Sequence, residues 1–101
     1  MPNTKKAWSL LSRHGQALVI LAKNPNVRIL DLAKMLGISE RSVRLLLGSL
    51  HRSKILRVER TGRNNTYQVD YSFELPSEVE KSIPLKSIVD LAGSPALPPA
   101  S

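Results

Sequence analysis

The strongest constraint on the fold lies in DLAKMLGISERSVRLLLGSL, residues 31–50, where two runs of helical periodicity are separated by three residues. The first run places four apolar residues on one helical face: Ile29, Leu32, Ala33 and Leu36. Gly37 then stands where a helix commonly ends in a left-handed conformation, and Ser39 is a favourable N-cap. The pattern predicts two helices joined by Gly-Ile-Ser, a link short enough to restrict how they cross.

The second of these helices, predicted over 39–52, has two faces of different chemistry. At 100° per residue, one face collects the residues expected in the core: Val43, Leu46, Leu47 and Leu50. The opposite face collects Arg41, Leu45, Gly48 and Arg52, with Arg44 and His51 on one flank. Packing therefore explains three of the leucines, whereas Leu45 is left facing outward.

Beyond residue 54 the apolar period changes from 3.6 towards 2. The segments ILRVER (55–60) and TYQVDY (66–71) are rich in β-formers, and TGRNN (61–65) between them has turn composition. The pattern predicts an antiparallel hairpin whose tip is polar and basic. A hairpin placed after the helix pair would set a second cationic element beside the first.

The flanking segments complete the predicted organisation. WSLLSRHGQALVILAKNP predicts a mostly buried helix that begins between Ser9 and Ser12 and ends at Asn24–Pro25. The stripe of Leu85, Ile88, Val89 and Ala92 predicts a short helix. We expect that helix to pack either on the first helix of its own chain or on a second copy, and we favour the second copy. Residues 93–101, GSPALPPAS, are expected to be disordered.

Charge and composition narrow the function. Residues 1–69 carry thirteen Lys/Arg against three Asp/Glu, a net +10, whereas residues 70–101 carry two against five, a net −3. Such a basic field suits a polyanionic partner. The chain has no cysteine, and its longest apolar run, ALVILA, is far too short to span a membrane, so a cytoplasmic protein without membrane contact is expected.

The residues that enzymes and metal sites require are scarce. His14 and His51 lie in different predicted helices, with no cysteine and few acids near them, so we expect no catalytic site, no metal, no cofactor and no enzyme activity. Trp8 is expected to plug the core or an interface. The chain has only four aromatic residues, which disfavours RNA recognition by base stacking.

The run LAKMLGISERSVRLLLGSLHRSKILRVERTGRNNTYQV resembles the winged helix-turn-helix of bacterial transcription regulators of the MarR and ArsR type. With WSLLSRHGQALVILA ahead of it, the resemblance spans roughly residues 8–70 and points to a small MarR-like group. It implies a mainly α fold with a small antiparallel hairpin and a winged helix-turn-helix DNA-binding domain over 1–73. Residues 74–92 would then be an extension whose short helix is a candidate dimerisation element.

The resemblance also implies a DNA site, with residues 39–52 as a recognition helix in the major groove and residues 60–65 as a basic wing. Carried over by position, the DNA-contacting residues are Ser39, Arg41, Ser42, Arg44, Leu45, Arg52, Arg60, Arg63, Asn64 and Asn65. The partners implied are double-stranded DNA and a second copy of the chain, and whether a small-molecule effector binds is left open.

The chain departs from the family pattern in two ways. Leu45 stands where a polar or basic residue is more usual, and the long dimerisation helices are missing. Two hypotheses follow. The first is a sequence-specific DNA-binding regulator, in which Leu45 contacts a thymine methyl group. The second is a winged-helix module that binds another protein through Leu45 and does not bind DNA.

Overall fold

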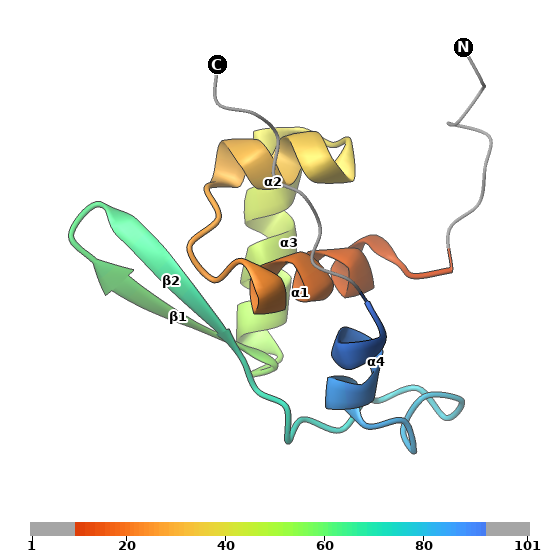
Figure 1. The fold of residues 1–101 in the computed structure, drawn as a ribbon. Helices are drawn as coiled ribbons and strands as arrows, with labels where there is room; N and C mark the ends of the chain where they lie inside the picture. Colours follow the sequence, from red (N-terminus) through yellow and green to blue (C-terminus); the bar gives the residue numbers. More distant parts are fainter. Residues whose placement is uncertain (1–9, 93–101) are drawn as a thin grey trace, which may run out of the picture.

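Three helices, a β-hairpin and a fourth helix follow one another along the chain in a computed structural model that describes residues 10–92. The elements are α1 (Arg13–Lys23), α2 (Ile29–Leu36), α3 (Glu40–Arg52), β1 (Leu56–Thr61), β2 (Asn64–Val69) and α4 (Leu85–Leu91). The hairpin extends from one side of the helical body and α4 lies on the other (Figure 1). The predicted class, mainly α with a small antiparallel hairpin, is confirmed. Trp8 and the predicted disordered tail lie outside the described residues.

Local hydrogen bonds fix the ends of α1. Ser12 is its N-cap, accepting the N–H of Gly15 at 3.2 Å, so the first helical residue falls one position after the predicted window of 9–12. At the other end, the N–H of Asn24 donates to the carbonyl of Ile20. The Arg13 guanidinium donates to the carbonyl of Leu36, which ties the start of α1 to the end of α2.

The turn between α2 and α3 has the predicted form. Gly37 adopts φ +70, the left-handed conformation that glycine reaches without strain. The N–H groups of Gly37 and Ile38 both donate to the carbonyl of Ala33, at 2.8 and 3.1 Å. Ser39 then caps α3 by accepting the N–H of Ser42 at 3.0 Å. The predicted helix of residues 39–52 is confirmed, with Ser39 as its cap.

The core forms where the three helices and the base of the hairpin meet. Each predicted inward residue of α3 is buried: Val43, Leu46, Leu47 and Leu50. Ala33 is also buried, as the close approach of α2 and α3 requires. Burying a Val or Leu side chain contributes about 1.5–3 kcal/mol each, so this apolar face is what holds α3 in place.

The hairpin differs from its prediction, which placed strands at 55–60 and 66–71 around a five-residue turn. The structure has a two-residue turn, Gly62–Arg63, and Gly62 adopts φ +62. A glycine with positive φ at the first central position suits the tight turns that join twisted antiparallel strands. Asn64 and Asn65 consequently leave the turn and join β2, where they pair with Thr61 and Arg60.

The linker between α1 and α2 lies along the free edge of β2. The N–H of Tyr67 donates to the carbonyl of Pro25 at 2.9 Å, and the Thr66 hydroxyl donates to Asn26 Oδ1 at 2.9 Å. Val27, which follows these contacts in the chain, is buried in the core. The linker therefore anchors the hairpin to the helical body.

Helix α4 packs on α1 of its own chain. Leu85 and Val89 are each 3% exposed, and Leu85 belongs to the main core cluster. The sequence left open whether this helix packs on its own chain or on a second copy. Its inward face packs on its own chain, although Leu91 remains 89% exposed. None of the helices within residues 10–92 has the length and apolar character needed to cross a membrane.

Candidate nucleic-acid interface

The outward face of α3 is cationic and exposed. Arg41, Arg44, Leu45 and Arg52 all lie on the surface, as the helical periodicity predicts. Gly48 lies between them but is only half-exposed, because the Arg52 guanidinium leans back over it. A Cβ atom at Gly48 would stand 3.1 Å from Arg52 Nη1. Helical side chains tilt towards the N-terminus, which brings Arg52 onto the preceding turn.

The first turn of α3 is ordered by its own side chains. Ser39 Oγ accepts the N–H of Ser42 and donates to Ser42 Oγ, each at 3.0 Å. The Ser42 hydroxyl hydrogen is left to donate outward. Arg44 Nη2 lies 3.7 Å from Glu40 Oε1, and both side chains are largely exposed. Exposed ion pairs of this kind contribute little, so an external anion can displace Glu40 from Arg44.

The predicted wing residues divide between the two faces of the ribbon. Arg60 and Asn65 are directly opposed and therefore share a face, the same face as Val58 and Tyr67. Asn64 lies on the other face, opposite Thr61. Arg63 stands in the turn itself, and Arg60 Nε donates to the carbonyl of Gly62 at 3.1 Å. Of the four, Arg63 alone occupies the apex.

A cleft of about 280 Å³ separates the wing from the α1–α2 linker. Its lining comprises Asn26, Val27, Arg28 and Ile29 from the linker side and Arg63, Asn64, Asn65 and Tyr67 from the hairpin. The sequence pattern assigned no function to residues 26–28 and did not predict this cleft. The polar residues on either side of the single buried Val27 were the one signal for it.

Leu45 borders a shallow hollow between α3 and the start of α1. The hollow measures about 380 Å³ and is lined by Arg13, His14, Ile38, Ser42, Leu45, Leu46 and Ser49. Leu45 is 63% exposed there. Its side chain thus continues a mixed apolar and basic surface and does not stand isolated on the helix.

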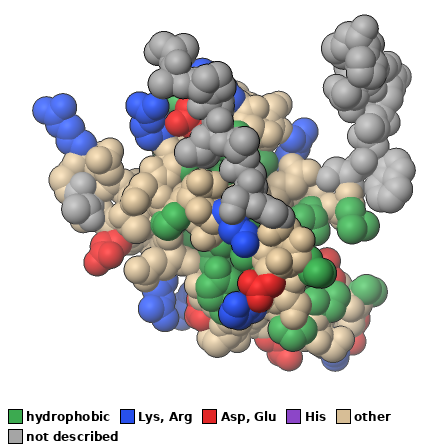
Figure 2. All heavy atoms as spheres, viewed as in Figure 1, with side chains coloured by type: hydrophobic (Ala, Val, Ile, Leu, Met, Phe, Trp, Pro, Cys, Tyr) green, Lys and Arg blue, Asp and Glu red, His purple; other side chains and the backbone are tan. Residues whose placement is uncertain are grey.

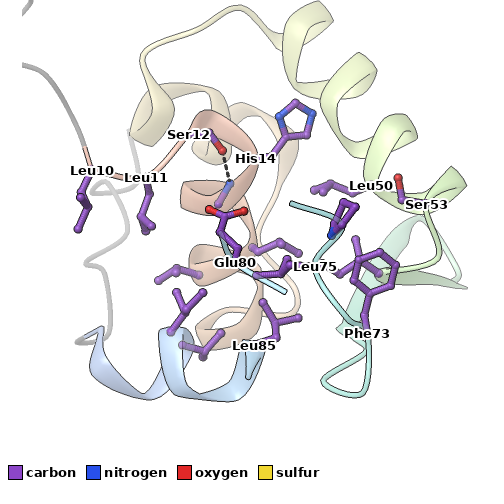
Figure 3. Close-up of a pocket in the computed structure, with 17 residues that line it drawn as sticks. Leu10, Leu11, Ser12, His14, Leu50, Ser53, Phe73, Leu75, Glu80 and Leu85 are labelled. Atoms are coloured by element: carbon purple, nitrogen blue, oxygen red, sulfur yellow. Dashed lines mark hydrogen bonds between the residues drawn. The ribbon is translucent and has the colours of Figure 1, made fainter. Parts of the chain in front are cut away.

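A larger, apolar cavity of about 410 Å³ lies away from α3's outward face, between α1, α4 and residues 73–80. Leu10, Leu11, Phe73, Leu75 and Leu85 surround it, and the polar side chains of Ser12 and Glu80 also belong to its lining (Figure 3). Exposed hydrophobic side chains gather on the same side of the molecule, over α4 and the beginning of α1 (Figure 2).

The described residues offer little for metal chemistry or unusual acid–base chemistry. Between residues 10 and 92, no three His, Cys, Asp or Glu side chains come together as metal ligands. Hydrogen bonds from the hydroxyl and the N–H of Ser72 lower the pKa of Asp70, just beyond β2. A hydrogen bond to Asp90 raises the pKa of Lys86 on α4. Both shifts arise from local surface contacts.

Comparison with known proteins bears on the fold. No protein-family model matches the chain, and no curated protein matches its sequence. Among solved structures, the chain is similar to the crystal structure of the zinc-dependent MarR family transcriptional regulator AdcR in the Zn(II)-bound state. The TM-score is 0.50 at 15% sequence identity, and the match covers 84% of this chain and 52% of that chain.

The chain thus spans about half the length of the regulator that it matches. Zinc dependence is a property of that regulator. At this level of identity the likeness concerns the fold. Together with the order of α1–α3 and the β1–β2 hairpin, it establishes that residues 10–92 adopt a winged-helix fold.

Proposed function

We propose that the chain is a cytoplasmic, MarR/ArsR-like transcriptional regulator that binds double-stranded DNA sequence-specifically as a homodimer. The observation that carries this proposal is the outward face of α3, where Arg41, Arg44 and Arg52 are exposed on a helix presented by a tight turn beside a basic wing. The fold likeness to a transcriptional regulator supports it.

In this proposal α3 enters the major groove. An arginine fork can donate two hydrogen bonds to guanine O6 and N7, a role suited to Arg41 and Arg44 near the start of the helix. Leu45 would contact a thymine methyl group. Ser39 and Ser42, at the start of the helix, would face the bases in the same groove. The wing would contact the phosphate backbone or insert into the minor groove through Arg60, Arg63, Asn64 and Asn65.

The homodimer is supported by the opposite side of the molecule. Leu10, Val79 and Leu91 are 86%, 83% and 89% exposed, around the start of α1 and α4. Exposed apolar groups in one region are typical of a surface that another protein covers. In this proposal residues 74–92 form the dimerisation extension of the DNA-binding domain over 1–73.

The decisive experiment is selection of bound sequences from a random duplex pool. We expect an enriched sequence with two half-sites about one helical turn apart, and binding that weakens with salt at a log–log slope of about −0.9 per phosphate neutralised. A pool without enrichment and without salt-dependent binding would contradict the proposal.

Two arginine variants distinguish base recognition from contact with the DNA backbone. Arg44→Ala should cost about 1–3 kcal/mol at the selected site and relax the preference there. Arg63→Ala should weaken selected and random duplexes alike. An equal loss on both duplexes for Arg44→Ala would remove Arg44 from base recognition.

A second candidate function is a winged-helix module that binds another protein and not DNA. The exposed Leu45 beside its hollow favours it. This candidate requires that the purified protein bind no duplex at low salt and that Leu45→Asp abolish capture of a protein partner. Salt-sensitive duplex binding by the unmodified chain excludes it.

A further inference from the structure

We propose that the cleft between the α1–α2 linker and the wing binds one phosphate group of the DNA backbone, with Arg28 as its main cationic ligand on the linker side. This inference rests on the proposed function and deepens it. It adds the linker, which sequence reasoning did not implicate, to the DNA contacts of α3 and the wing.

The chemistry of the cleft suits a phosphate oxyanion. Arg28 and Arg63 stand on opposite walls, and three asparagines, Asn26, Asn64 and Asn65, complete the polar lining. No acidic side chain belongs to the lining within the described part of the chain. Guanidinium and amide N–H groups are the donors by which proteins hold phosphates.

The neighbouring acid leaves Arg28 able to bind a second anion. Arg28 Nε lies 3.5 Å from Asp31 Oδ2, so the contact uses one edge of the guanidinium. The Arg28 side chain is 71% exposed, and its terminal nitrogens remain available to a ligand. Asp31, whose side chain is only 16% exposed, thus holds the guanidinium by one edge and offsets part of the positive charge that Arg28 brings to the cleft.

The walls of the cleft are held together at its base. The bond from Tyr67 N–H to the carbonyl of Pro25 and the bond from Thr66 to Asn26 join linker and hairpin directly. Because Asn26 Oδ1 accepts from Thr66, the N–H groups of its amide are left to donate to a ligand. On the hairpin wall, Asn65 Nδ2 lies 3.5 Å from the hydroxyl of Tyr67, two residues further along β2. The two walls therefore keep their spacing, as binding of a small anion between them requires.

The geometry of a duplex explains why a phosphate would arrive there. The major and minor grooves are separated by one sugar–phosphate strand on each side. A protein with α3 in the major groove and its wing tip at the adjacent minor groove must straddle that strand. The cleft lies between the residues leading into the α2–α3 pair and the wing tip, on the path such a strand would follow.

The test compares Arg28→Gln with Arg57→Gln, which removes the same charge from an exposed residue at the base of β1, outside the lining of the cleft. On the selected duplex, Arg28→Gln should bind roughly tenfold more weakly, and its log–log salt slope should be shallower by about 0.9. Sequence preference should not change, because a phosphate contact carries no base information. Arg57→Gln should leave affinity and slope close to those of the unmodified chain. Equal thermal unfolding midpoints would show that both variants fold.

Neutral methylphosphonates placed one at a time along each strand locate the contact. We expect one position per half-site, between the major-groove sequence and the next minor groove, to weaken binding of the unmodified chain but not of Arg28→Gln. An unchanged salt slope for Arg28→Gln, or the same methylphosphonate loss in both proteins, would overturn the inference while the regulator stood. A chain that bound no duplex would overturn the proposed function and the inference with it.

Discussion

The outward face of α3 and the face around α4 differ in what their side chains do. On α3, arginines stand exposed on a helix whose inner leucines are buried, and the wing continues the basic surface. Around α4, Leu85 and Val89 are buried and line an apolar cavity, whereas Leu91 and Val79 are exposed. If the α3 face binds DNA as proposed, binding to DNA and stability of the fold depend on different residues, which substitutions can test one face at a time.

The largest effect is expected from Leu85→Ala. Leu85 is 3% exposed in the core cluster and also lines the apolar cavity, so truncation would enlarge a space that is already open. We expect a loss of about 2–5 kcal/mol in the free energy of unfolding, measured by urea denaturation. Leu91→Ala, with its side chain 89% exposed, is the control and should cost little. Similar losses for both would mean that α4 does not anchor the fold as described.

Leu45→Asp should show the reverse pattern. Because Leu45 is 63% exposed, we expect a change in unfolding free energy within about 0.5 kcal/mol. The added carboxylate would face phosphates and pair with neighbouring arginines, so affinity for the selected duplex should fall about tenfold or more, equivalent to about 1.4 kcal/mol. Titration of duplex at fixed salt measures it. Full affinity in the variant would place Leu45 outside the DNA interface.

Gly48→Ala is expected to move stability and binding in opposite directions. Replacing a glycine inside a helix by alanine stabilises it by about 0.5–1 kcal/mol. Among residues 10–92, the side-chain atoms within 4 Å of the new methyl group belong to the flexible end of Arg52, which can move away from it. The thermal unfolding midpoint should therefore rise. Affinity for the duplex should fall severalfold, because Arg52 is displaced on the outward face of α3. A variant that is less stable would show that Arg52 cannot be displaced cheaply.

The smallest effect concerns pH. Since the Ser72 hydrogen bonds lower the pKa of Asp70 in the folded chain, the carboxylate form is favoured on folding. The stabilisation is present above the unfolded pKa and is lost as pH falls through the folded value. Between about pH 6 and pH 3, the free energy of unfolding should therefore fall slightly less for Asp70→Asn than for the unmodified chain. Identical declines would mean that the Ser72 contacts do not persist in solution.

The helical part of the fold could be predicted because burial in a helix follows a local period. The positions of Val43, Leu46, Leu47 and Leu50 determine an inward direction without reference to the rest of the chain. The same argument placed Arg41 and Arg44 outside. The packing partner of Leu85 was harder to predict, because an amphipathic stripe shows that one face of a helix is covered but not by which surface.

The hairpin and the cleft were beyond such reasoning for physical reasons. Asn64 and Asn65 are residue types that favour turns. Whether they belong to the turn or to the following strand depends on the backbone conformation of Gly62. The cleft depends on the bond between Tyr67 and Pro25, which are 42 positions apart in the sequence. Long-range pairing of this kind leaves no periodic signal, so Arg28 could not be placed beside Arg63.

The two-residue turn also limits what the wing could insert into DNA if the chain binds DNA as proposed. Six-residue strands extend roughly 20 Å, and they end at Gly62 and Arg63. The minor groove of B-DNA is only about 6 Å wide. A five-residue loop would present a broad tip, whereas this ribbon narrows to a glycine without a side chain and a single arginine. In the proposed DNA complex, the wing would therefore lead with one guanidinium, and the length of the ribbon would limit how deeply it enters the groove.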